Sequence, residues 1–425
     1  MKNVIDTLKA RGLIEQMTHD ELREKAGHPI KAYVGFDPTA DSLHLGNLVG
    51  IIALAWFQKF GHTPIVLLGG ATGRIGDPSG KSSERPLLDE KVLDANVSAL
   101  GRFFKKILDF SSGPRPVILN NNDWLGSFSF VGFLRDVGKH FRIGPMLAKE
   151  SVRARVQSEE GMSFTEFSYQ ILQAYDFHYL SEHHGVSLQM GGSDQWGNIT
   201  AGTELNRKLG CQTIYGLTFP LLTRSDGKKF GKSEEGAIWL SADKLSPFEF
   251  YQYLFRLPDA DVIRLLKMLT FVDLKEIDEI EKEMKKSGYV PNTAQKRLAE
   301  EVTRFVHGEE GVATAIRATE IAAPGSDAKL TGESLRELGS DIPSATVSYD
   351  EAVGQKYVDI AARVGLVPSK SEGVRLIKNG GAYLNNERIA DPSFSIGAAD
   401  LIDGVYLFFS AGKKKRLLIK VQKHA

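Results

Sequence analysis

The sequence contains a single cysteine, Cys211, among its 425 residues. One cysteine excludes a disulfide framework, and it also excludes a zinc site built from several cysteines. The sequence therefore predicts a chain without disulfides and without a metal held by its own side chains.

A net charge is also missing, because 53 Lys and Arg residues balance 53 Asp and Glu residues. The chain as a whole therefore does not attract nucleic acid electrostatically, and a nucleic-acid partner would have to bind a local cluster of positive charge. The charge is unevenly spread, however. The last segment, Tyr357–Ala425, carries 11 Lys and Arg against 6 Asp and Glu. A basic patch is therefore expected only near the C-terminus.

Long apolar runs are absent as well. The run Gly50–Phe57 is among the longest, and it is too short to cross a bilayer. Residues 1–27 alternate acidic and basic positions in a helical pattern, unlike a signal or transit peptide. With 42% hydrophobic and 25% charged residues, the composition is that of a globular protein with two or three domains. We expect a cytoplasmic location.

The first informative stretch is a strand followed by a turn and a helix. Lys31–Phe36 is aromatic and β-branched, as in a buried strand, and Pro38 ends it. Asp41 and Ser42 are the expected N-caps of the next helix. His44-Leu45-Gly46-Asn47 then falls in its first turn, where backbone N–H groups and the helix dipole attract phosphate. His44 and Asn47 can donate to a phosphate, and Gly46 leaves room for a purine; a surface histidine beside a tolerated glycine is the alternative.

Further strands follow at regular spacing and predict the fold class. They are Thr63–Leu68, Pro116–Leu119, Ser187–Met190 and Leu217–Leu222. Strands that alternate with helices at this spacing are typical of a doubly wound parallel α/β sheet, which binds ligands beyond the carboxyl ends of its strands. Asp77 follows the second strand and is expected at that edge.

The helix predicted over Phe164–Tyr179 carries an unusual polar stripe. Tyr169, Gln173 and Asp176 share one face, at positions i, i+4 and i+7. A solvent-facing stripe usually carries Lys, Glu or Arg, whereas these groups need hydrogen-bond partners when buried. The stripe predicts the wall of a polar pocket; a partly wet helix face is the alternative.

Two loops and one turn add candidate nucleotide contacts. In the turn Gly191–Asn198, Gly192 and Asp194 could meet a ribose, and Gln195 points toward the same edge. Lys81 and Arg85 lie four residues apart and could share an anion. The loop Arg224–Ser233 contains Lys229 and Lys232, which could close over a polyphosphate. For each of these segments, an ordinary solvated turn is the alternative.

The remainder of the chain changes character. Pro247–Ala322 is helical throughout, Ala323–Ser348 has the composition of a linker, and the basic tail holds two helices and three short strands. Positive charge in the tail suits an RNA backbone; a solubilising tail is the alternative. The cations concerned are Arg363, Lys370, Arg375, Lys378, Lys413, Lys414, Lys415 and Arg416. The predicted domains are 1–235 (catalytic, Rossmann-like), 236–322 (all-α), 323–350 (linker) and 351–425 (small α+β).

Taken together, these motifs resemble the bacterial-type tyrosyl-tRNA synthetases, a class I family, over essentially the whole chain. His44–Asn47 is similar to the HIGH box of that family, and Lys229-Phe230-Gly231-Lys232-Ser233 is similar to its KMSKS loop. The C-terminal segment resembles the family's S4-type RNA-binding domain. One departure is Asn47, where bacterial members usually have histidine; asparagine keeps a neutral donor of shorter reach.

The resemblance implies an activity and roles for residues. L-Tyrosine reacts with ATP to give tyrosyl-adenylate and pyrophosphate, and the tyrosyl group passes to tRNA(Tyr). The implied phosphate and leaving-group residues are His44, Asn47, Thr39, Lys81, Arg85, Lys229 and Lys232. The implied tyrosine contacts are Tyr33 and Asp176 at the hydroxyl, Asp77, Tyr169 and Gln173 at the ammonium, and Gln195. The implied ATP contacts are Gly35, Asp37, Thr39, His44, Gly46, Asn47, Gly192, Asp194 and Lys232.

It further implies Mg²⁺ that enters with ATP, a homodimer with Phe128–Phe133 and Phe164 near the contact, and tRNA contacts that include Arg207 and Lys208. Three alternatives remain. A tryptophanyl-tRNA synthetase would need an indole pocket, which the facing Tyr33 and Asp176 oppose. An inactive RNA binder would not need the loop lysines. Another HIGH-bearing nucleotidyltransferase would not need the helical and basic C-terminal parts.

Overall fold

The structure is a computed structural model. It describes residues 3–81, 83, 88–159, 161–223, 225, 230–233, 236–321, 323, 325, 330–339, 342–412 and 415–422. The chain divides into two compact units. The first comprises residues 1–244 and 257–302, and the second comprises residues 245–256 and 303–425.

The first unit is built on a six-stranded sheet with the order β1-β6-β5-β2-β3-β4. Its strands are β1 (Gln16–Met17), β2 (Lys31–Phe36), β3 (Thr63–Leu68), β4 (Val117–Asn120), β5 (Leu188–Gly192) and β6 (Tyr215–Phe219). All pairs are parallel except β1 with β6. The predicted doubly wound parallel sheet is confirmed.

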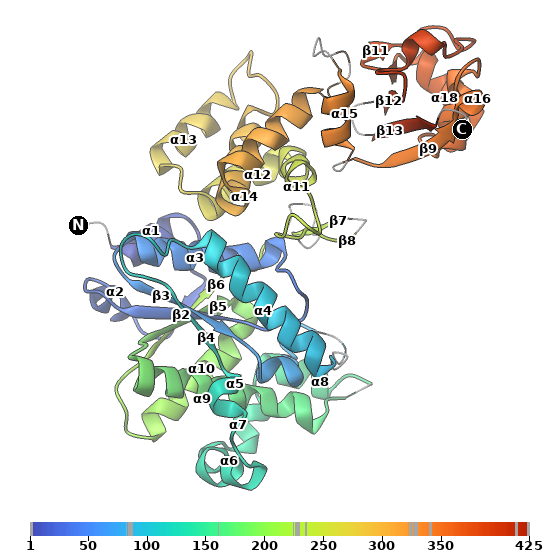
Figure 1. The fold of residues 1–425 in the computed structure, drawn as a ribbon. Helices are drawn as coiled ribbons and strands as arrows, with labels where there is room; N and C mark the ends of the chain where they lie inside the picture. Colours follow the sequence, from blue (N-terminus) through green and yellow to red (C-terminus); the bar gives the residue numbers. More distant parts are fainter. Residues whose placement is uncertain are drawn as a thin grey trace. The chain divides into compact units, whose positions relative to one another are not determined.

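Helices cover both faces of this sheet (Figure 1). α3 (Leu48–Lys59) contacts β2 and β3, and ten of its twelve residues are buried, as its apolar sequence requires. α4 (Glu90–Ile107) contacts β3 on the same side. α9 (Phe164–His184) and α10 (Trp196–Lys208) pack against each other, and α10 contacts β5 and β6. Both faces of the sheet are therefore covered by helices, and ligands can reach the sheet only at its edges.

Shorter elements complete the first unit. They are α1 (Val4–Ala10), α2 (Leu22–Lys25), η1 (Leu45–Asn47), η2 (Thr72–Arg74), α5 (Asn122–Leu125), α6 (Phe130–Asp136), η3 (Gly138–His140), α7 (Ile143–Leu147), α8 (Glu150–Val156), η4 (Ser193–Gln195), the pair β7 (Lys232–Ser233) and β8 (Gly236–Ala237), α12 (Asp259–Leu269) and α13 (Leu274–Glu283). Arg11 joins α12 to the body, because its guanidinium donates to the carbonyl oxygens of Lys267, Thr270 and Val272.

The second unit contains a five-stranded sheet with the order β11-β10-β12-β13-β9. Its elements are α11 (Pro247–Phe255), α15 (Gly332–Leu338), β9 (Ser344–Ser348), α16 (Tyr349–Ala352), α17 (Tyr357–Arg363), α18 (Lys370–Lys378), β10 (Ala382–Leu384), β11 (Glu387–Arg388), η5 (Ala398–Asp400), β12 (Tyr406–Ala411) and β13 (Lys415–Gln422). α14 (Thr293–Ile321) contributes to both units and bends at Gly308, which has φ 76° and ψ −177°. This backbone conformation is essentially restricted to glycine.

The segment predicted as a linker is more ordered than its composition indicated. It contains α15, and β9 lies parallel to β13 in register from Leu418–Ser344 to Gln422–Ser348. The prediction that α15 and β9 are part of a linker is wrong. β9 obtains its backbone hydrogen bonds from β13, and local composition does not reveal such long-range pairing. The proposed domain boundaries themselves stay a prediction.

Candidate functional site

The candidate site lies where the strand order of the first unit reverses. The chain runs outward from β2 through β3 to β4, then returns to place β5 on the other side of β2. Between two such halves, the carboxyl ends of the central strands open a crevice that binds ligands. Asp37 follows β2, Asp77 follows β3, Asn121 follows β4, and Asp194 follows β5. The predicted edge therefore collects polar side chains from four strands.

His44 and Asn47 form a reciprocal cap at the start of η1. The Gly46 N–H donates to His44 Nδ1 at 3.1 Å, and the His44 N–H donates to Asn47 Oδ1 at 3.1 Å. The prediction that Asp41 and Ser42 are the caps is wrong: Asp41 pairs with Lys244 at 2.7 Å, and the Ser42 hydroxyl donates to the Leu43 carbonyl.

This cap decides which atoms can face a phosphate. Because His44 Nδ1 accepts a hydrogen bond, the neutral ring carries its proton on Nε2, which can donate. Asn47 uses its oxygen in the cap, so its amide nitrogen can donate in the same way. A Cβ on Gly46 would lie 2.9 Å from His44 Cε1, so only glycine permits this ring position.

The end of the cationic loop pairs with the His44 segment. The Leu45 N–H donates to the Ile238 carbonyl at 2.7 Å, and the Ile238 N–H donates to the Gly231 carbonyl at 2.9 Å. His44 also forms an antiparallel bridge with Trp239. The two motifs that the resemblance singled out are thus held together by backbone. Lys229 lies outside the described residues, as does the side chain of Lys232.

Asp37 links β2 to the polar stripe of α9. Its Oδ2 accepts from the Tyr169 hydroxyl at 2.7 Å, and its Oδ1 accepts from the Thr72 hydroxyl at 2.7 Å. Burial, followed by the charges of Asp37 and Asp77, raises the pKa of Tyr169 well above its usual value. Tyr169 therefore stays a neutral donor that directs its proton to Asp37.

Asp176 lies at the buried end of the same stripe and is 2% exposed. Its carboxylate accepts from Asn121 Nδ2 at 2.9 Å and from Trp124 Nε1 at 2.7 Å. Burial raises the pKa of Asp176 to about 7, although these two hydrogen bonds act in the opposite direction. A buried acid with two fixed donors is a positioned acceptor for one further polar group.

Tyr33 lies close enough to Asp176 to feel its charge, and it is 1% exposed. Burial first, and then Asp176, raises the pKa of Tyr33 well above its usual value. Among the residues that the structure describes, none accepts from or donates to the Tyr33 hydroxyl. A buried hydroxyl without a partner costs free energy, so a ligand that bonds to it gains that energy back.

The other end of the stripe meets Asp77, which is 9% exposed. Asp77 Oδ2 accepts from Gln195 Nε2 at 2.6 Å, and Gln173 Nε2 donates to Gln195 Oε1 at 3.2 Å. Asn198 Nδ2 donates to Gln173 Oε1 at 3.0 Å. A carboxylate surrounded by amides, next to Tyr169, is suited to a small cation such as an ammonium group.

The remaining predicted contacts with nucleotide lie around Asp194. Burial and the charge of Asp77 raise the pKa of Asp194, and the charge of Lys81 lowers it. Thr39 and Gly35 are exposed at the β2 end of the crevice. Gly192 is the last residue of β5. Arg85 lies outside the described residues, so nothing in the structure tests whether it shares an anion with Lys81.

The basic residues of the second unit are mostly exposed but engaged with acids. Lys370 pairs with Asp359 at 2.9 Å, Arg375 with Glu372 at 3.2 Å, and Arg363 with Glu351 at 3.6 Å. Lys378 and Lys415 are exposed. Arg416 is partly buried, and burial followed by the charge of Arg256 lowers its pKa to about 10. Lys413 and Lys414 lie outside the described residues.

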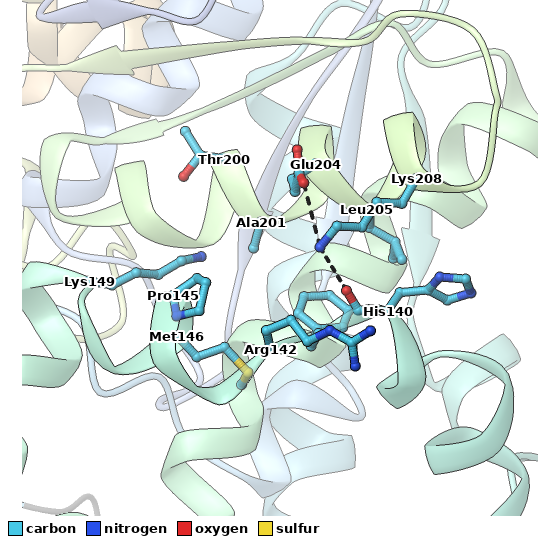
Figure 2. A pocket seen from close by; sticks show the side chains of 11 residues that line it. His140, Arg142, Pro145, Met146, Lys149, Thr200, Ala201, Glu204, Leu205 and Lys208 are labelled. Atoms are coloured by element: carbon cyan, nitrogen blue, oxygen red, sulfur yellow. Dashed lines mark hydrogen bonds and ion pairs between the residues drawn. The ribbon is translucent and has the colours of Figure 1, made fainter.

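Arg207 and Lys208 end α10, away from the crevice residues named above. Both pair with Glu204, at 2.8 Å and 3.5 Å, and the Lys208 ammonium donates to the His140 carbonyl at 2.8 Å. Figure 2 shows Lys208 beside a pocket of about 160 Å³ between α10 and the 140–149 segment. Burial lowers the pKa of Lys149, on the rim of this pocket, to about 8.

Sequence reasoning missed several residues of the site. Thr72, Asn121, Trp124 and Asn198 hold the carboxylates of Asp37, Asp77 and Asp176 in place. The signal for Asn121 was present, since the polar turn 120–123 follows a strand at the carboxyl edge of the sheet. Trp124 gave no signal, because an indole is typical of a hydrophobic core.

Two models of known protein families match most of the chain. A family model described as tRNA synthetases class I (W and Y) matches residues 25–322. A second model, described as the tyrosine–tRNA ligase SYY-like C-terminal domain, matches residues 334–419. Within the described ranges, no helix combines the length and the apolar content that a membrane span requires.

Curated relatives match the chain over nearly its whole length. The chain is 56% identical over 422 residues to a tyrosine–tRNA ligase of Protochlamydia amoebophila, with 99% of each chain covered. It is 52% identical to the chloroplastic/mitochondrial tyrosine–tRNA ligase of Arabidopsis thaliana, over 99% of this chain and 84% of the relative. A truncated mitochondrial tyrosyl-tRNA synthetase of Aspergillus nidulans has a similar solved structure (TM-score 0.65, 33% identity, 74% of this chain and 92% of that one).

Proposed function

The chain belongs to the class I tRNA synthetases of the tryptophan and tyrosine type, and from this premise we propose how its own residues perform the tyrosine–tRNA ligase reaction. In that reaction the carboxylate of L-tyrosine attacks the α-phosphate of ATP, which forms tyrosyl-adenylate and releases pyrophosphate. A ribose hydroxyl at the 3′ end of tRNA(Tyr) then takes the tyrosyl group. The nucleophile is already anionic, so catalysis consists of positioning and of stabilising charge on phosphate.

The observation that carries the choice of amino acid is the buried Tyr33 hydroxyl. It has no partner among the described residues and lies near Asp176. The phenol of the substrate donates to Asp176 and accepts from Tyr33, so that both buried groups are satisfied at once. Phenylalanine would leave both unsatisfied, and an indole N–H could donate to Asp176 but could not accept from Tyr33.

The α-ammonium group of tyrosine binds at the opposite end of the stripe. Asp77 supplies the charge, and Tyr169 and Gln173 supply oxygen acceptors on the same face of α9. Gln195, bonded to both Asp77 and Gln173, fixes their orientation. The substrate carboxylate then points toward the crevice between β2 and β5, where ATP lies.

ATP occupies the crevice beside η1. His44 Nε2–H and the Asn47 amide donate to its phosphates, and Gly46 allows the adenine to approach the backbone. Asp194 and Gly192 contact the ribose, while Asp37, Gly35 and Thr39 line the nucleotide from β2. Lys81, Arg85, Lys229 and Lys232 neutralise the departing pyrophosphate.

Mg²⁺ fits this arrangement as a companion of ATP. Mg²⁺ is usually bound by substrate phosphates, water and one or two carboxylates, and the carboxylates of Asp37 and Asp194 lie in the crevice. Bound to the phosphates, the ion would supply charge neutralisation.

The cytoplasmic location expected from the sequence stays a prediction.

Two copies of the chain are proposed to associate through α6, α7 and the start of α9. Large apolar side chains are exposed there: Phe130 is 66% exposed, Val131 73%, Ile143 66% and Phe164 64%. Phe128 and Phe133 instead pack against Tyr175 inside the unit. Large apolar side chains exposed to this degree favour a protein partner, and a second copy of the chain offers the same side chains in return.

Substitution tests this dimer. Phe164→Asp should convert the purified protein from a dimer to a monomer in sedimentation velocity, because an unpaired carboxylate cannot be buried in an apolar contact. Val290→Asp, a change at an equally exposed apolar residue after α13, should leave the dimer intact. A wild-type monomer at all concentrations would contradict the proposal.

The activity itself is tested by amino-acid-dependent ATP–pyrophosphate exchange. We expect exchange with tyrosine and none with tryptophan, phenylalanine or no amino acid. Exchange with tryptophan would keep the fold and overturn the tyrosine pocket. No exchange with any amino acid would indicate a protein that only binds RNA, and would direct attention to Asn47.

A lysine substitution separates the chemistry from RNA binding. Lys232→Ala should reduce exchange by at least about 100-fold, since one preorganised charge at the leaving group contributes several kcal/mol. Binding of tRNA should change little. Lys285→Ala, a control on an exposed lysine that pairs with Glu281, should match the wild type in both assays.

A further inference from the structure

Three different metal-ligating side chains meet on the outer face of α9, away from the tyrosine pocket. His178 and Glu182 lie four residues apart on this helix, and Cys211 follows the end of α10. One nitrogen, one carboxylate oxygen and one sulfur from these residues lie within 4.8 Å of one another. We propose that His178, Glu182 and Cys211 bind a zinc ion.

The imidazole of His178 is oriented for this role by a buried amide. His178 Nδ1 is 2.9 Å from Asn206 Oδ1, and Asn206 is 0% exposed. Asn206 Nδ2 donates to the Gln212 carbonyl at 2.5 Å, so the amide oxygen faces the ring. An amide oxygen can only accept, and Nδ1 therefore carries the proton. Nε2 is left as the lone-pair nitrogen, which is how metal-binding histidines are held by an outer partner.

The same asparagine fixes the turn that carries the thiol. The Cys211 N–H donates to the Asn206 carbonyl at 3.1 Å, and Gly210 takes φ +72° to close the end of α10. Gln212 Nε2 donates to the Ser181 hydroxyl of α9 at 3.2 Å. The thiol and the imidazole are thus attached to one rigid junction, and only the Glu182 side chain has to adjust.

The donor set selects the metal. In a tetrahedral zinc site, bonds of about 2.0–2.3 Å place ligand atoms roughly 3.3–3.8 Å apart. The three ligand atoms lie within 4.8 Å of one another, so small side-chain adjustments, the largest available to the exposed Glu182, bring them to that geometry. A thiolate with an imidazole favours zinc and disfavours Mg²⁺ and Ca²⁺, which prefer oxygen ligands. His178 and Cys211 are partly exposed, so water completes the fourth position.

Binding replaces the thiol proton by the metal. The proton of Cys211 passes to solvent, the thiolate bonds to zinc, and no electron is transferred. In the metal-free protein the Cys211 thiol donates to the Leu209 carbonyl at 3.9 Å. The ion would then link α9, which carries Tyr169, Gln173 and Asp176, to the end of α10. The count of one cysteine did not indicate this site, because its other two ligands come from elsewhere in the chain.

Cobalt provides the direct test. Full-length protein without a histidine tag is treated with a chelator, and Co²⁺ is titrated in. We expect one cobalt per chain with a sulfur-to-cobalt charge-transfer band that Zn²⁺ displaces. Since Cys211 is the only cysteine, Cys211→Ser must abolish this band. Absence of the band in the wild type would overturn the proposal.

Zinc affinity, measured against a competing chelator, tests the three ligands separately. His178→Gln, Glu182→Gln and Cys211→Ser should each weaken zinc binding by about 10-fold to 100-fold or more. His183→Gln, at a neighbouring exposed histidine of the same helix, is the control and should bind zinc as the wild type does. Equal zinc affinities of the wild type and Cys211→Ser would overturn the proposal.

Thermal unfolding gives a readout independent of spectra. A ligand that binds only the folded state raises Tm as its concentration increases. Zinc should raise Tm of the wild type and of His183→Gln, and should leave Cys211→Ser unchanged. An equal shift in all three proteins would indicate binding elsewhere and contradict the assignment.

Discussion

At the scale of single residues, the site depends on groups that are buried and only partly satisfied. Asp176 accepts two hydrogen bonds, from Asn121 and Trp124, and the Tyr33 hydroxyl has no partner among the residues that the structure describes. A substrate that makes the hydrogen bonds missing from the empty pocket gains binding free energy from them. Two substitutions distinguish an effect on tyrosine binding from an effect on the free energy of unfolding.

Tyr33→Phe removes the hydroxyl and keeps the ring that packs edge-on against Phe177. Because the hydroxyl has no partner in the described part of the chain, the free energy of unfolding should change by less than about 1 kcal/mol. In pyrophosphate exchange, kcat/KM for tyrosine should fall roughly 3-fold to 10-fold, which corresponds to one neutral hydrogen bond. Unchanged kcat/KM would show that Tyr33 does not contact the substrate.

Trp124→Phe tests the support of Asp176. The substitution removes a hydrogen bond to a carboxylate, which contributes about 1.5–3 kcal/mol, so kcat/KM for tyrosine should fall roughly 10-fold to 100-fold. The matched control is Tyr179→Phe, because this ring stacks on Trp124 at 4.4 Å without a bond to Asp176. Equal losses in the two variants would show that packing, not the indole N–H, matters.

At the scale of elements, the hydrogen bonds of the backbone decide what the sequence pattern leaves open. The cap at η1 uses Nδ1 of His44 and the side-chain oxygen of Asn47. The cap does not use Nε2 of His44 or the amide nitrogen of Asn47, which are the donors that we propose for phosphate.

α14 contains the clearest pH-sensitive group outside the site. His307, one residue before the bend at Gly308, packs edge-on against Phe250, and its Nε2 is buried without a partner among the described residues. Burial lowers the pKa of His307 from 6.5 to about 4. Between these values the unfolded chain binds more protons than the folded one, so stability decreases as pH falls from about 6.5 to about 4.

This prediction can be measured by urea unfolding at several pH values. At about 1.36 kcal/mol per pKa unit, His307 accounts for a loss of up to about 3 kcal/mol over that window. His307→Gln cannot titrate there, so its stability should depend less on pH by that amount. Identical pH profiles for the two proteins would contradict the assignment to His307, whatever their absolute stabilities.

At the scale of the whole molecule, catalysis and tRNA binding are expected to depend on different parts of the chain. The first unit holds the residues that we propose for adenylate formation, and the exposed cations of α18 belong to the second unit. Contacts between lysine or arginine and phosphate release counterions, so they make binding depend on salt.

The double substitution Arg375→Ala with Lys378→Ala tests this separation. It should weaken tRNA binding and reduce the slope of log K against log salt by about 2, because two phosphate contacts are lost. Pyrophosphate exchange, which needs no tRNA, should stay at the wild-type rate. A parallel loss of exchange would show that these cations act on the catalytic unit. Lys285→Ala serves as the control for a charge removed elsewhere.

The sequence alone determined the fold class, the edge of the sheet that carries the chemistry and the residue types found there. Strand hydrophobicity, proline stops and polar turns are local signals, and the strands of the first sheet follow from them. The polar stripe Tyr169, Gln173 and Asp176 was predictable for the same reason, since helical periodicity alone places these residues on one face.

Only the tertiary structure decided how these groups are held. The bonds of Asp176 to Asn121 and Trp124 and the pairing of Leu45 with Ile238 each join residues far apart in the sequence. The addition of β9 to β13 and the meeting of His178 with Cys211 are equally long-range. Such contacts follow from packing and register, which no short window of sequence contains, and they convert a plausible set of side chains into a defined site.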